Sequence, residues 1–287
     1  MTLDPHLYAQ LQNLYKYPRT PHLESSRLQL GDMDNDQARY QSLIGKYIVV
    51  EEKVDGANAG ISFSSAGELL LQSRGHYLVG GSRERQFSML KLWAKVHERW
   101  LLDRLEDRYV MFGETMSKVH SVYYDALPHI FLEFDILDRK RGVFLSTQAR
   151  RTMLEGGPVL SVPVLYEGIA PQSLAGLLKL VGHSKARTTN WRESFAAAVL
   201  REELDLKMAW KNLDESDLME GLYLKTESAG ETTGRLKWVR HDFVQSIQDA
   251  GVHHLQQPYI PNRLADGVDL YSPQLAVTWE EINKGDR

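Results

Sequence analysis

The hydrophobic and polar positions of this chain follow two periods, one typical of strands and one of helices. Between residues 47 and 73, apolar residues come in short stretches that are β-branched or alternate with polar residues. We expect the stretches at 47–51, 59–63 and 69–73 to form an antiparallel meander. The other predicted strands are 109–112, 130–136, 221–225 and 235–239, the last two forming a pair.

Helical spacing appears in the segments between these strands. Apolar residues recur at intervals of three or four over residues 89–105, with charged residues opposite, so we expect one amphipathic helix there. Ser146 is a suitable N-cap for a helix that ends at Leu154, just before the breaker sequence 156–158. The remaining predicted helices are 173–181 and 194–210.

Clusters of strands with helices inserted between them favour an α+β fold over a doubly wound parallel sheet. The 287 residues contain no internal repeat and are enough to bury a sizeable core. The tail after residue 240 is short for an independent domain. We therefore expect one domain over residues 1–240, followed by a short C-terminal extension over residues 241–287.

The composition excludes several classes of protein. With 43% hydrophobic and 25% charged residues, the chain is neither disordered nor collagen-like. Its net charge of −4 excludes a protein coated with basic charge, so nucleic acid would bind only at a local patch. The absence of cysteine excludes disulfides and thiol catalysis. No apolar run is long enough to span a membrane and no secretion signal is visible, so we expect a cytoplasmic protein with no membrane partner.

The candidate chemistry begins at Lys53, which follows a predicted strand and precedes the turn Asp55-Gly56. Alone, this pattern more often marks a solvated lysine in a surface turn. An ordered set of residues further along the chain favours a functional lysine instead. The set is Arg74 in Ser-Arg-Gly, Glu114 in Phe-Gly-Glu, Phe134 in Phe-Leu-Glu-Phe-Asp-Ile, Glu220 and Lys225 in Glu-Gly-Leu-Tyr-Leu-Lys, and Arg235 and Lys237 in Arg-Leu-Lys.

In this order, these residues resemble motifs I, Ia, III, IIIa, IV and V of the covalent nucleotidyltransferase superfamily, which contains ATP-dependent ligases and mRNA capping enzymes. The likeness covers roughly residues 45–240 and is closer to the ATP-dependent RNA ligases of bacteria and phage. Asn58 stands where DNA ligases and capping enzymes usually carry arginine, as in the phage ligase that seals nicks in duplex RNA. Residues 16–23 and 112–136 are similar to a group of bacterial RNA-ligase-like proteins. The resemblance implies the nucleotidyltransferase (ligase adenylation domain) fold, with antiparallel sheets flanked by helices.

The resemblance further implies an ATP-dependent RNA ligase that joins 5′-phosphate and 3′-hydroxyl ends. Lys53 would take AMP from ATP, the AMP would pass to the RNA 5′-phosphate, and the 3′-hydroxyl would displace it. Mg²⁺, or Mn²⁺, would offset the phosphate charge. A lysine must lose its proton before it attacks phosphorus, and we expect neighbouring cations to lower the pKa of Lys53. The expected cations are Arg74, Lys225, Arg235 and Lys237.

Three of the implied roles concern the nucleoside. The backbone at Glu52 and Val54 would read the adenine edge, Glu114 would accept a hydrogen bond from the ribose 2′-hydroxyl, and Phe134 would stack on adenine. Phe131 alternates with Phe134 in the same apolar strand, so one of the two rings is expected to be plain core. An exposed loop carboxylate is the alternative for Glu114.

The other implied roles concern phosphate and metal. Arg74, Lys225 and Lys237 would contact phosphate, and Glu220 would help to hold the metal ion. Arg235 stands where such ligases commonly carry lysine, which keeps the charge but changes its shape. The alternatives are ordinary surface cations and one more solvated acid.

Other functions remain open on the sequence alone. They are a DNA ligase or 5′-end adenylating enzyme, a non-catalytic sensor of nucleotides or RNA ends, and an enzyme that relies on an end-processing partner protein. His120 and His129 lack metal-ligand spacing and are expected to be loop or core residues. The basic candidates for gripping RNA are Lys91, Lys95, Arg99, residues 139–141, Arg150, Arg151, Lys179, His183, Lys185, Arg187 and Arg192.

Overall fold

The computed structural model describes residues 14–28, 37–243 and 258–272, and every structural statement below concerns these ranges. The strands are β1 (His22–Leu23), β2 (Gln37–Ala38), β3 (Tyr47–Lys53), β4 (Ala57–Phe63), β5 (Leu69–Ser73), β6 (Tyr109–Thr115), β7 (Phe131–Asp138), β8 (Val143–Leu145), β9 (Leu160–Ser161), β10 (Val164–Ile169), β11 (Gly221–Ser228) and β12 (Glu231–Val239). The α-helices are α2 (Ser88–Val96), α3 (Glu98–Leu105), α4 (Thr147–Leu154), α5 (Leu174–Leu178), α6 (Trp191–Arg201) and α7 (Leu206–Lys211), and short 3-10 helices cover Tyr40–Leu43 and Ser82–Phe87.

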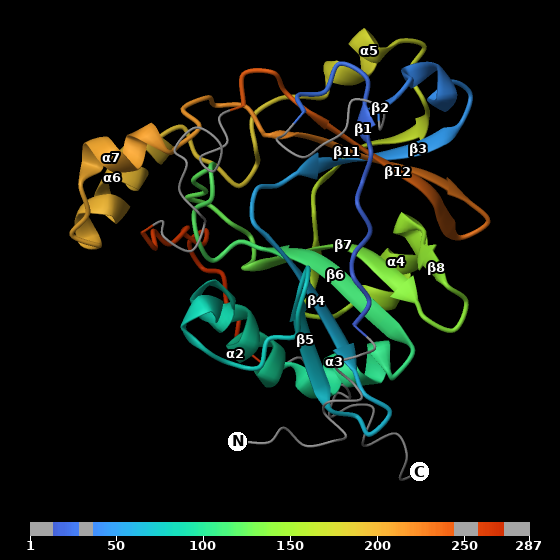
Figure 1. Ribbon diagram of the computed structural model, residues 1–287, viewed down its shortest axis with the longest axis horizontal. Coiled ribbons are helices and arrows are strands. Elements are labelled where there is room, and N and C mark those ends of the chain that lie inside the picture. Colours follow the sequence, from blue (N-terminus) through green and yellow to red (C-terminus); the bar gives the residue numbers. More distant parts are fainter. Residues whose placement is uncertain (1–13, 29–36, 244–257, 273–287) are drawn as a thin grey trace, which may run out of the picture.

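The strands form a sheet in the order β10-β3-β11-β12-β8-β7-β6-β4-β5, and neighbours along this path are antiparallel. The short strand β8 is the narrow link, because it pairs with β12 and β7 over only a few residues. It divides the sheet into two halves, β10-β3-β11-β12 and β7-β6-β4-β5, which Figure 1 shows one above the other. The predicted α+β class with mainly antiparallel sheet is confirmed.

Each half of the sheet has its own apolar layer. Helices α2 and α3 cover β4, β5 and β6, where Trp93 and Leu101 pack in one cluster with Phe63. On the other half, Val50 of β3 packs in a cluster with Leu177 of α5. Apolar burial of this kind is the main favourable term in folding. Because the helices take the outer faces, polar side chains from both halves can meet between them.

The predicted meander is wrong for its first strand. Strand β4 pairs with β5 as expected, but β3 pairs with β10 and β11, and β4 pairs with β6. The side chains of residues 48–50 are all buried, as in a strand covered on both faces rather than the edge of a hairpin. The turn at residues 54–56 therefore carries the chain from one half of the sheet to the other.

Two predicted helices are each divided in the structure. The segment 89–105 breaks at His97, whose backbone leaves the helical region (φ −100°, ψ 14°) and whose Nε2 lies 2.7 Å from the carbonyl oxygen of Leu270. The segment 194–210 breaks where Glu203 adopts φ 55°, and Asp205 then caps α7 by accepting a hydrogen bond from the Met208 amide. These breaks depend on tertiary contacts and turn geometry that the apolar spacing does not encode.

Predictions that rest on local signals are confirmed. Ser146 caps α4 by accepting a hydrogen bond from the Ala149 amide, and the helix ends before residues 156–158. The last strand pair forms with Gly221 opposite Val239, and it extends to the turn at Gly230. The helix predicted at 173–181 forms over the shorter span of α5.

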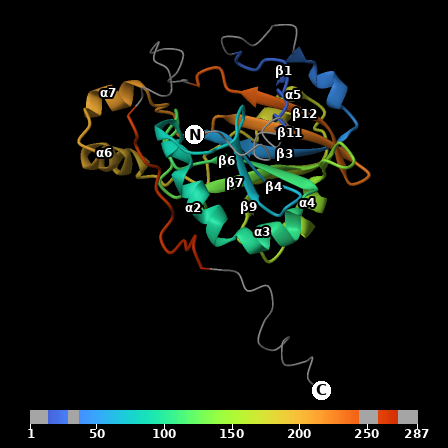
Figure 2. The same ribbon diagram turned by 60° about the horizontal axis from the view of Figure 1, so that its bottom comes forward.

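The described part of the tail lies against the rest of the chain. Residues 258–272 run beside α2 in Figures 1 and 2, and the carbonyl oxygen of Ile260 accepts a hydrogen bond from the Val119 amide. Leu270 joins the cluster formed by α2 and α3. The boundary at residue 240 stays a prediction. None of the helices in the described ranges has the length and apolar character of a transmembrane span.

Candidate functional site

A pocket of about 610 Å³ opens between the two halves of the sheet. Its walls come from the end of β3 and the turn after it, the end of β5, and parts of β6, β7, β11 and β12. Residues near the N-terminus of the chain, among them Tyr17 and Thr20, close one side. The predicted site residues that line the pocket are Glu52, Lys53, Val54, Arg74, Glu114, Phe134, Glu220 and Lys237.

Lys53 is the last residue of β3, and the pairing of β3 with β11 decides what it meets. Lys53 lies opposite Gly221 in the register, so Glu220 stands beside it. The Lys53 Nζ is 2.6 Å from Oε1 of Glu220, whose side chain is only 1% exposed. The nucleophile predicted from the sequence therefore lies inside the pocket as one half of an ion pair.

The expectation that cations lower the pKa of Lys53 is wrong for this state of the protein. Burial does act to lower the pKa, but the negative charges of Glu220, Asp55 and Glu114 outweigh it and raise the pKa above its ordinary value. The nearest groups to the amine are thus acids rather than the predicted cations. Lys53 is held as an ammonium while Glu220 stays ionised beside it.

The carboxylates of Glu114 and Glu220 have raised pKa values. Burial raises the pKa of Glu114 to about 8 and that of Glu220 to about 7, although Lys53 lowers both. One oxygen of each, Oε2, is buried without a hydrogen-bond partner within the described chain. Two carboxylates with spare oxygens suit Mg²⁺, which commonly binds one or two protein carboxylates together with substrate phosphates. No set of three or more His, Cys, Asp or Glu side chains in the described ranges is arranged to hold a metal ion.

The residues expected to bind the nucleoside are Glu52 and Val54, through their backbone, Glu114 of β6 and Phe134 of β7, and all four line the pocket. Glu52 is buried, and burial raises its pKa while Ser184, Lys185 and Arg187 act in the opposite direction. Val54 is buried in an apolar cluster that includes half-buried Phe134. Of the two candidate rings, Phe134 lines the pocket whereas Phe131 is fully buried in the core. The structure therefore leaves Phe134 as the ring available to a ligand.

The cations expected to bind phosphate are divided between the pocket and the region behind it. Arg74 is exposed in the turn after β5, and Lys237 is half-buried in β12, and both line the pocket. Lys225 and Arg235 do not. Lys225 is completely buried, with its Nζ 2.9 Å from Glu51 Oε2. Arg235 lies with its guanidinium carbon 3.8 Å from the ring centre of Phe144.

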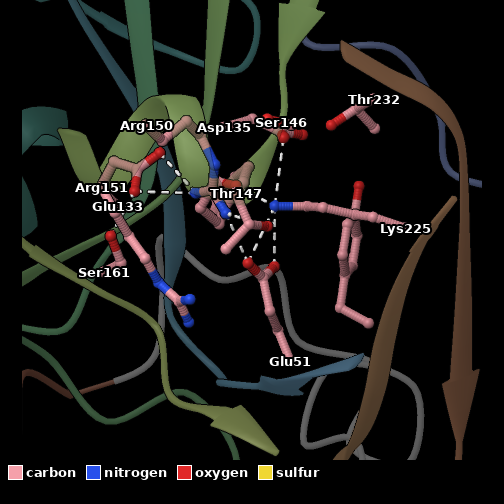
Figure 3. Close-up of polar contacts among 12 residues, drawn as sticks. Glu51, Glu133, Asp135, Ser146, Thr147, Arg150, Arg151, Ser161, Lys225 and Thr232 are labelled. Carbon is pink, nitrogen blue, oxygen red and sulfur yellow. Dashed lines mark hydrogen bonds and ion pairs between the residues drawn. The ribbon is translucent and has the colours of Figure 1, made fainter. Parts of the chain in front are cut away.

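Lys225 and Arg235 belong to a network of alternating charge, and Figure 3 shows its members Glu51, Glu133, Asp135, Arg150 and Lys225. Lys225 lies 3.2 Å from Asp135 Oδ1, and Arg235 lies 3.2 Å from Oδ2 of the same carboxylate. Burial acts to raise the pKa of Asp135, but Lys225, Arg150 and Arg235 together hold it below its ordinary value. On the other side of Glu51, Arg150 of α4 joins β3 to β7. The network thus fixes the two halves of the sheet to each other behind Lys53.

Sequence reasoning missed several residues that shape the pocket. Tyr17 donates a hydrogen bond to Asp135, and its ring packs edge-on against Phe134 with ring centres 5.2 Å apart. The hydroxyl of Tyr223 lies 2.6 Å from that of Tyr17. Alternation along β11 was the available signal for Tyr223, because it shares a face with Lys225. Tyr17 lies in no regular element and gave no such signal.

Two further residues connect the turn after β3 to the opposite loop. The carboxylate of Asp55 accepts hydrogen bonds from the amides of Ser121 and Val122, at 2.6 and 2.8 Å. This brings His120 to the pocket lining, so its place in a loop is as expected but its position at the site was not foreseen. His129 is a buried core residue, as expected.

Comparison with known proteins adds an independent finding. The family model described as RNA ligase matches residues 46–239. No curated protein sequence matches the chain. Among solved structures, a Naegleria gruberi RNA ligase variant with ATP and Mn is 14% identical and has a TM-score of 0.45, covering 80% of this chain and 62% of that one. An archaeal ATP-dependent RNA ligase is 18% identical with a TM-score of 0.46, covering 80% of this chain and 49% of that one. The chain therefore spans about three fifths or less of these two proteins.

Proposed function

The chain belongs to the RNA ligase family, and from this premise we propose that it is an ATP-dependent RNA ligase whose nucleophile is Lys53. The observation that carries the proposal is the ion pair of Lys53 and Glu220 inside a pocket that also contains Glu114, Arg74 and Lys237. A lone surface lysine would have neither buried carboxylates at hydrogen-bond distance nor a cavity large enough for a nucleotide. The other proposed roles are those that the motifs imply.

In the first step, the Nζ of Lys53 attacks the α-phosphorus of ATP. The ammonium first loses one proton to solvent. The N–P bond then forms as the bond to the pyrophosphate oxygen breaks, pyrophosphate leaves, and the nitrogen releases a second proton to solvent. Catalysis of this type depends mainly on positioning and charge neutralisation. In this proposal Arg74 and Lys237 neutralise phosphate, Phe134 stacks on adenine, and Glu114 accepts a hydrogen bond from the ribose; all four line the pocket. In later steps AMP passes to an RNA 5′-phosphate, and a 3′-hydroxyl displaces it to form a phosphodiester.

Lys225 and Arg235 act from behind the pocket in this proposal. Their shared partner Asp135 lies next to Phe134 in β7, and Lys225 also donates a hydrogen bond to the Phe134 carbonyl oxygen. They would hold the adenine-stacking ring in place and add positive potential behind the phosphates. Direct contact with phosphate would require Lys225 to leave Glu51.

A divalent cation, Mg²⁺ or Mn²⁺, fits the unpartnered oxygens of Glu114 and Glu220. When bound, it would supply positive charge that stabilises the phosphates and the leaving pyrophosphate. Glu220 is the better ligand because it borders the amine that reacts, and Glu114 is shared with the ribose role.

Label transfer from α-labelled ATP tests the first step. The wild-type protein is expected to acquire a covalent label in the presence of Mg²⁺, and Lys53→Ala is expected to acquire none. Lys46→Ala is the matched control, because Lys46 is exposed just before the opposite end of β3 and should not affect labelling. Persistent label on Lys53→Ala would remove Lys53 from its role, and no label on the wild type would favour a non-catalytic sensor.

The adenylated protein then tests the choice of strand. We expect it to transfer AMP to 5′-phosphorylated RNA and to join that RNA to a 3′-hydroxyl end. Equal activity on DNA would favour a general polynucleotide ligase, and accumulation of adenylated ends without joining would favour a requirement for an end-processing partner protein. We further propose that the protein is cytoplasmic. We also propose that residues 258–272 form part of the catalytic domain, because they pack on its core.

A further inference from the structure

Most of the basic residues that the sequence marks for gripping RNA are neutralised within the fold. On α2 and α3, three of them form ion pairs with nearby carboxylates: Lys91, Lys95 and Arg99. The same holds for Lys140, Arg141, Arg150, Arg151 and Arg192. A polyanion gains little from a cation whose charge is already offset by a neighbour. Ion pairs thus weaken the case for eight of the candidates, and the remaining five are Arg139, Lys179, His183, Lys185 and Arg187.

A different basic feature separates the nucleotide pocket from a second hollow of about 850 Å³. Two segments form this separation, residues 85–89 and 117–120, and we refer to them as the ridge. In the first, residues 86–87 line the nucleotide pocket and Met89 lines the second hollow. In the second, His120 lines the pocket and Ser117 lines the second hollow. The ridge therefore borders both cavities.

The ridge carries two basic residues, Arg85 and Lys118, and each contacts the tail segment 258–272. The guanidinium carbon of Arg85 is stacked 4.4 Å from the ring centre of Tyr259. Lys118 is fixed by a backbone bridge to Pro261 in the same tail segment. Burial lowers the pKa of Lys118, and the positive charge of Arg85 lowers it further, because the two cations repel each other. In Figure 1 this tail segment (red) lies between α2 and the pair α6–α7.

The second hollow has a different character from the ridge. Arg201 and Arg263 line it, but so do three acids, Asp125, Glu193 and Asp266, and Arg263 pairs with Asp266 at 2.8 Å. Its lining therefore has one more acid than base, while hydroxyl, amide and apolar groups supply much of the rest. Such a lining suits uncharged bases and sugars better than phosphates.

We propose that Arg85 and Lys118 of the ridge, with Tyr259 stacked on Arg85, bind the backbone phosphates of the single-stranded RNA end whose 5′-phosphate enters the nucleotide pocket. This proposal rests on the function proposed above, since it places the rest of that substrate. The strand crosses the ridge from the pocket, and the nucleotides beyond it lie in the second hollow. A basic ridge next to an aromatic ring is the kind of surface that holds single strands without reading their sequence.

The energetics favour phosphate over other ligands at this point. Two like charges held near one another by fixed backbone repel, and a phosphate placed between them removes that repulsion. Tyr259 holds the Arg85 guanidinium in place, so less rotamer freedom is lost when the phosphate arrives. Each phosphate neutralised releases counterions, which makes the binding strongly dependent on salt.

The test compares RNA binding with adenylation in the full-length protein. The probe is a labelled, 5′-phosphorylated single-stranded RNA of about 12 nucleotides, a length that a single-strand groove can hold. For Arg85→Ala/Lys118→Ala we expect about tenfold weaker binding at moderate salt, and a salt slope shallower by about 0.7 for each phosphate that the variant no longer neutralises. Lysine adenylation from ATP alone should stay at the wild-type level, which also shows that the variant is folded.

Two controls keep the test specific. Lys95→Ala/Arg99→Ala removes the same charge from exposed positions on α2 and α3, and its binding and salt slope should match those of the wild type. Tyr259→Phe keeps the ring under Arg85 and should bind as the wild type does, whereas Tyr259→Leu should weaken binding.

The outcomes separate this proposal from the function on which it rests. An unchanged salt slope in Arg85→Ala/Lys118→Ala, or an equal loss in Lys95→Ala/Arg99→Ala, overturns the ridge. A wild type that binds the RNA through the ridge but never forms the lysine adduct overturns the ligase and leaves the ridge standing. If the ridge variant loses adenylation as well, the comparison of Tyr259→Phe with Tyr259→Leu decides.

Discussion

Arg150 offers the sharpest test of the network that joins the two halves of the sheet. Its side chain is 1% exposed, and its Nη1 lies 2.7 Å from Glu133 Oε1 while its Nη2 lies 2.7 Å from Glu51 Oε1. Both carboxylates are completely buried. Arg150→Met keeps a good helix former in α4 but leaves Glu133 without its ion-pair partner and Glu51 with Lys225 alone. Breaking a buried ion pair in this way costs about 3–5 kcal/mol, because a buried charge is left uncompensated.

The neighbouring residue supplies a matched control. Arg151 lies on the same helix and also pairs with a glutamate, but its side chain is 43% exposed and that of Glu167 is 33% exposed. Exposed pairs of this kind contribute about 0–1 kcal/mol. Arg151→Ala should therefore lower the free energy of unfolding by no more than that amount. The two arginines differ in burial and in the number of carboxylates that they pair with, two for Arg150 and one for Arg151.

Urea unfolding at pH 7 measures both variants. Arg150→Met should lose several times more stability than Arg151→Ala, with little change in the dependence on urea concentration. Adding Glu133→Gln to Arg150→Met should recover part of the loss, since the carboxylate that lost its ion-pair partner is then neutral. Equal losses for Arg150→Met and Arg151→Ala, or no recovery in the double variant, would refute the reasoning.

Three further predictions concern stability. Ser146→Ala removes the cap on the Ala149 amide and should lower the free energy of unfolding by about 1 kcal/mol in urea. Gly157→Ala places a new Cβ 1.9 Å from Trp100 Cζ2, so thermal unfolding should show a loss of about 1–3 kcal/mol from overpacking. Burial lowers the pKa of His129 to about 4, so the unfolded chain binds a proton there that the folded chain does not. Stability should therefore fall by up to about 3 kcal/mol between pH 6.5 and pH 4, and His129→Gln should show a weaker pH dependence in urea titrations.

The sequence was a reliable guide wherever a feature depends on neighbours in the chain. The cap at Ser146 and the stop after Leu154 follow from a side chain and a glycine pair a few residues apart. The pairing of β11 with β12 follows from two apolar stretches joined by a tight turn. These elements form as predicted because local hydrogen bonding and turn geometry are enough to specify them.

Pairing between distant segments was not predictable by the same reasoning. The run at residues 48–50 predicts a strand, but it does not reveal that β10 and β11 cover its two edges. Nor does it reveal that the chain turns away after Lys53 instead of forming a hairpin. The contact of Tyr17 with Asp135 joins residues 118 positions apart and lies outside any periodic segment. Which distant strands pair, and which distant residues come into contact, depends on the packing of the whole core.

At the site, too, the sequence predicts some features and not others. The order of the motifs indicates that Lys53, Glu114 and Glu220 serve one pocket, and the structure brings them together there. The alternation of Tyr223 and Lys225 shows that they share a face of β11, but not how deep each one lies. In the register, Tyr223 is opposite Glu51 and Lys225 is opposite Val49, so Lys225 is further from the end of β3 and is buried in the network.

The reversed sign of the pKa shift at Lys53 follows from the same register. Counting charges in the motifs gives an excess of cations and hence an activated amine. Position decides otherwise, because the start of β11 places Glu220 2.6 Å from the amine while Lys225 is held by Glu51 and Asp135. Coulombic interaction falls with distance, so the nearest carboxylate outweighs cations further away. The free protein therefore keeps Lys53 protonated, and a positive charge that engages Glu220 must weaken this ion pair before the amine can react.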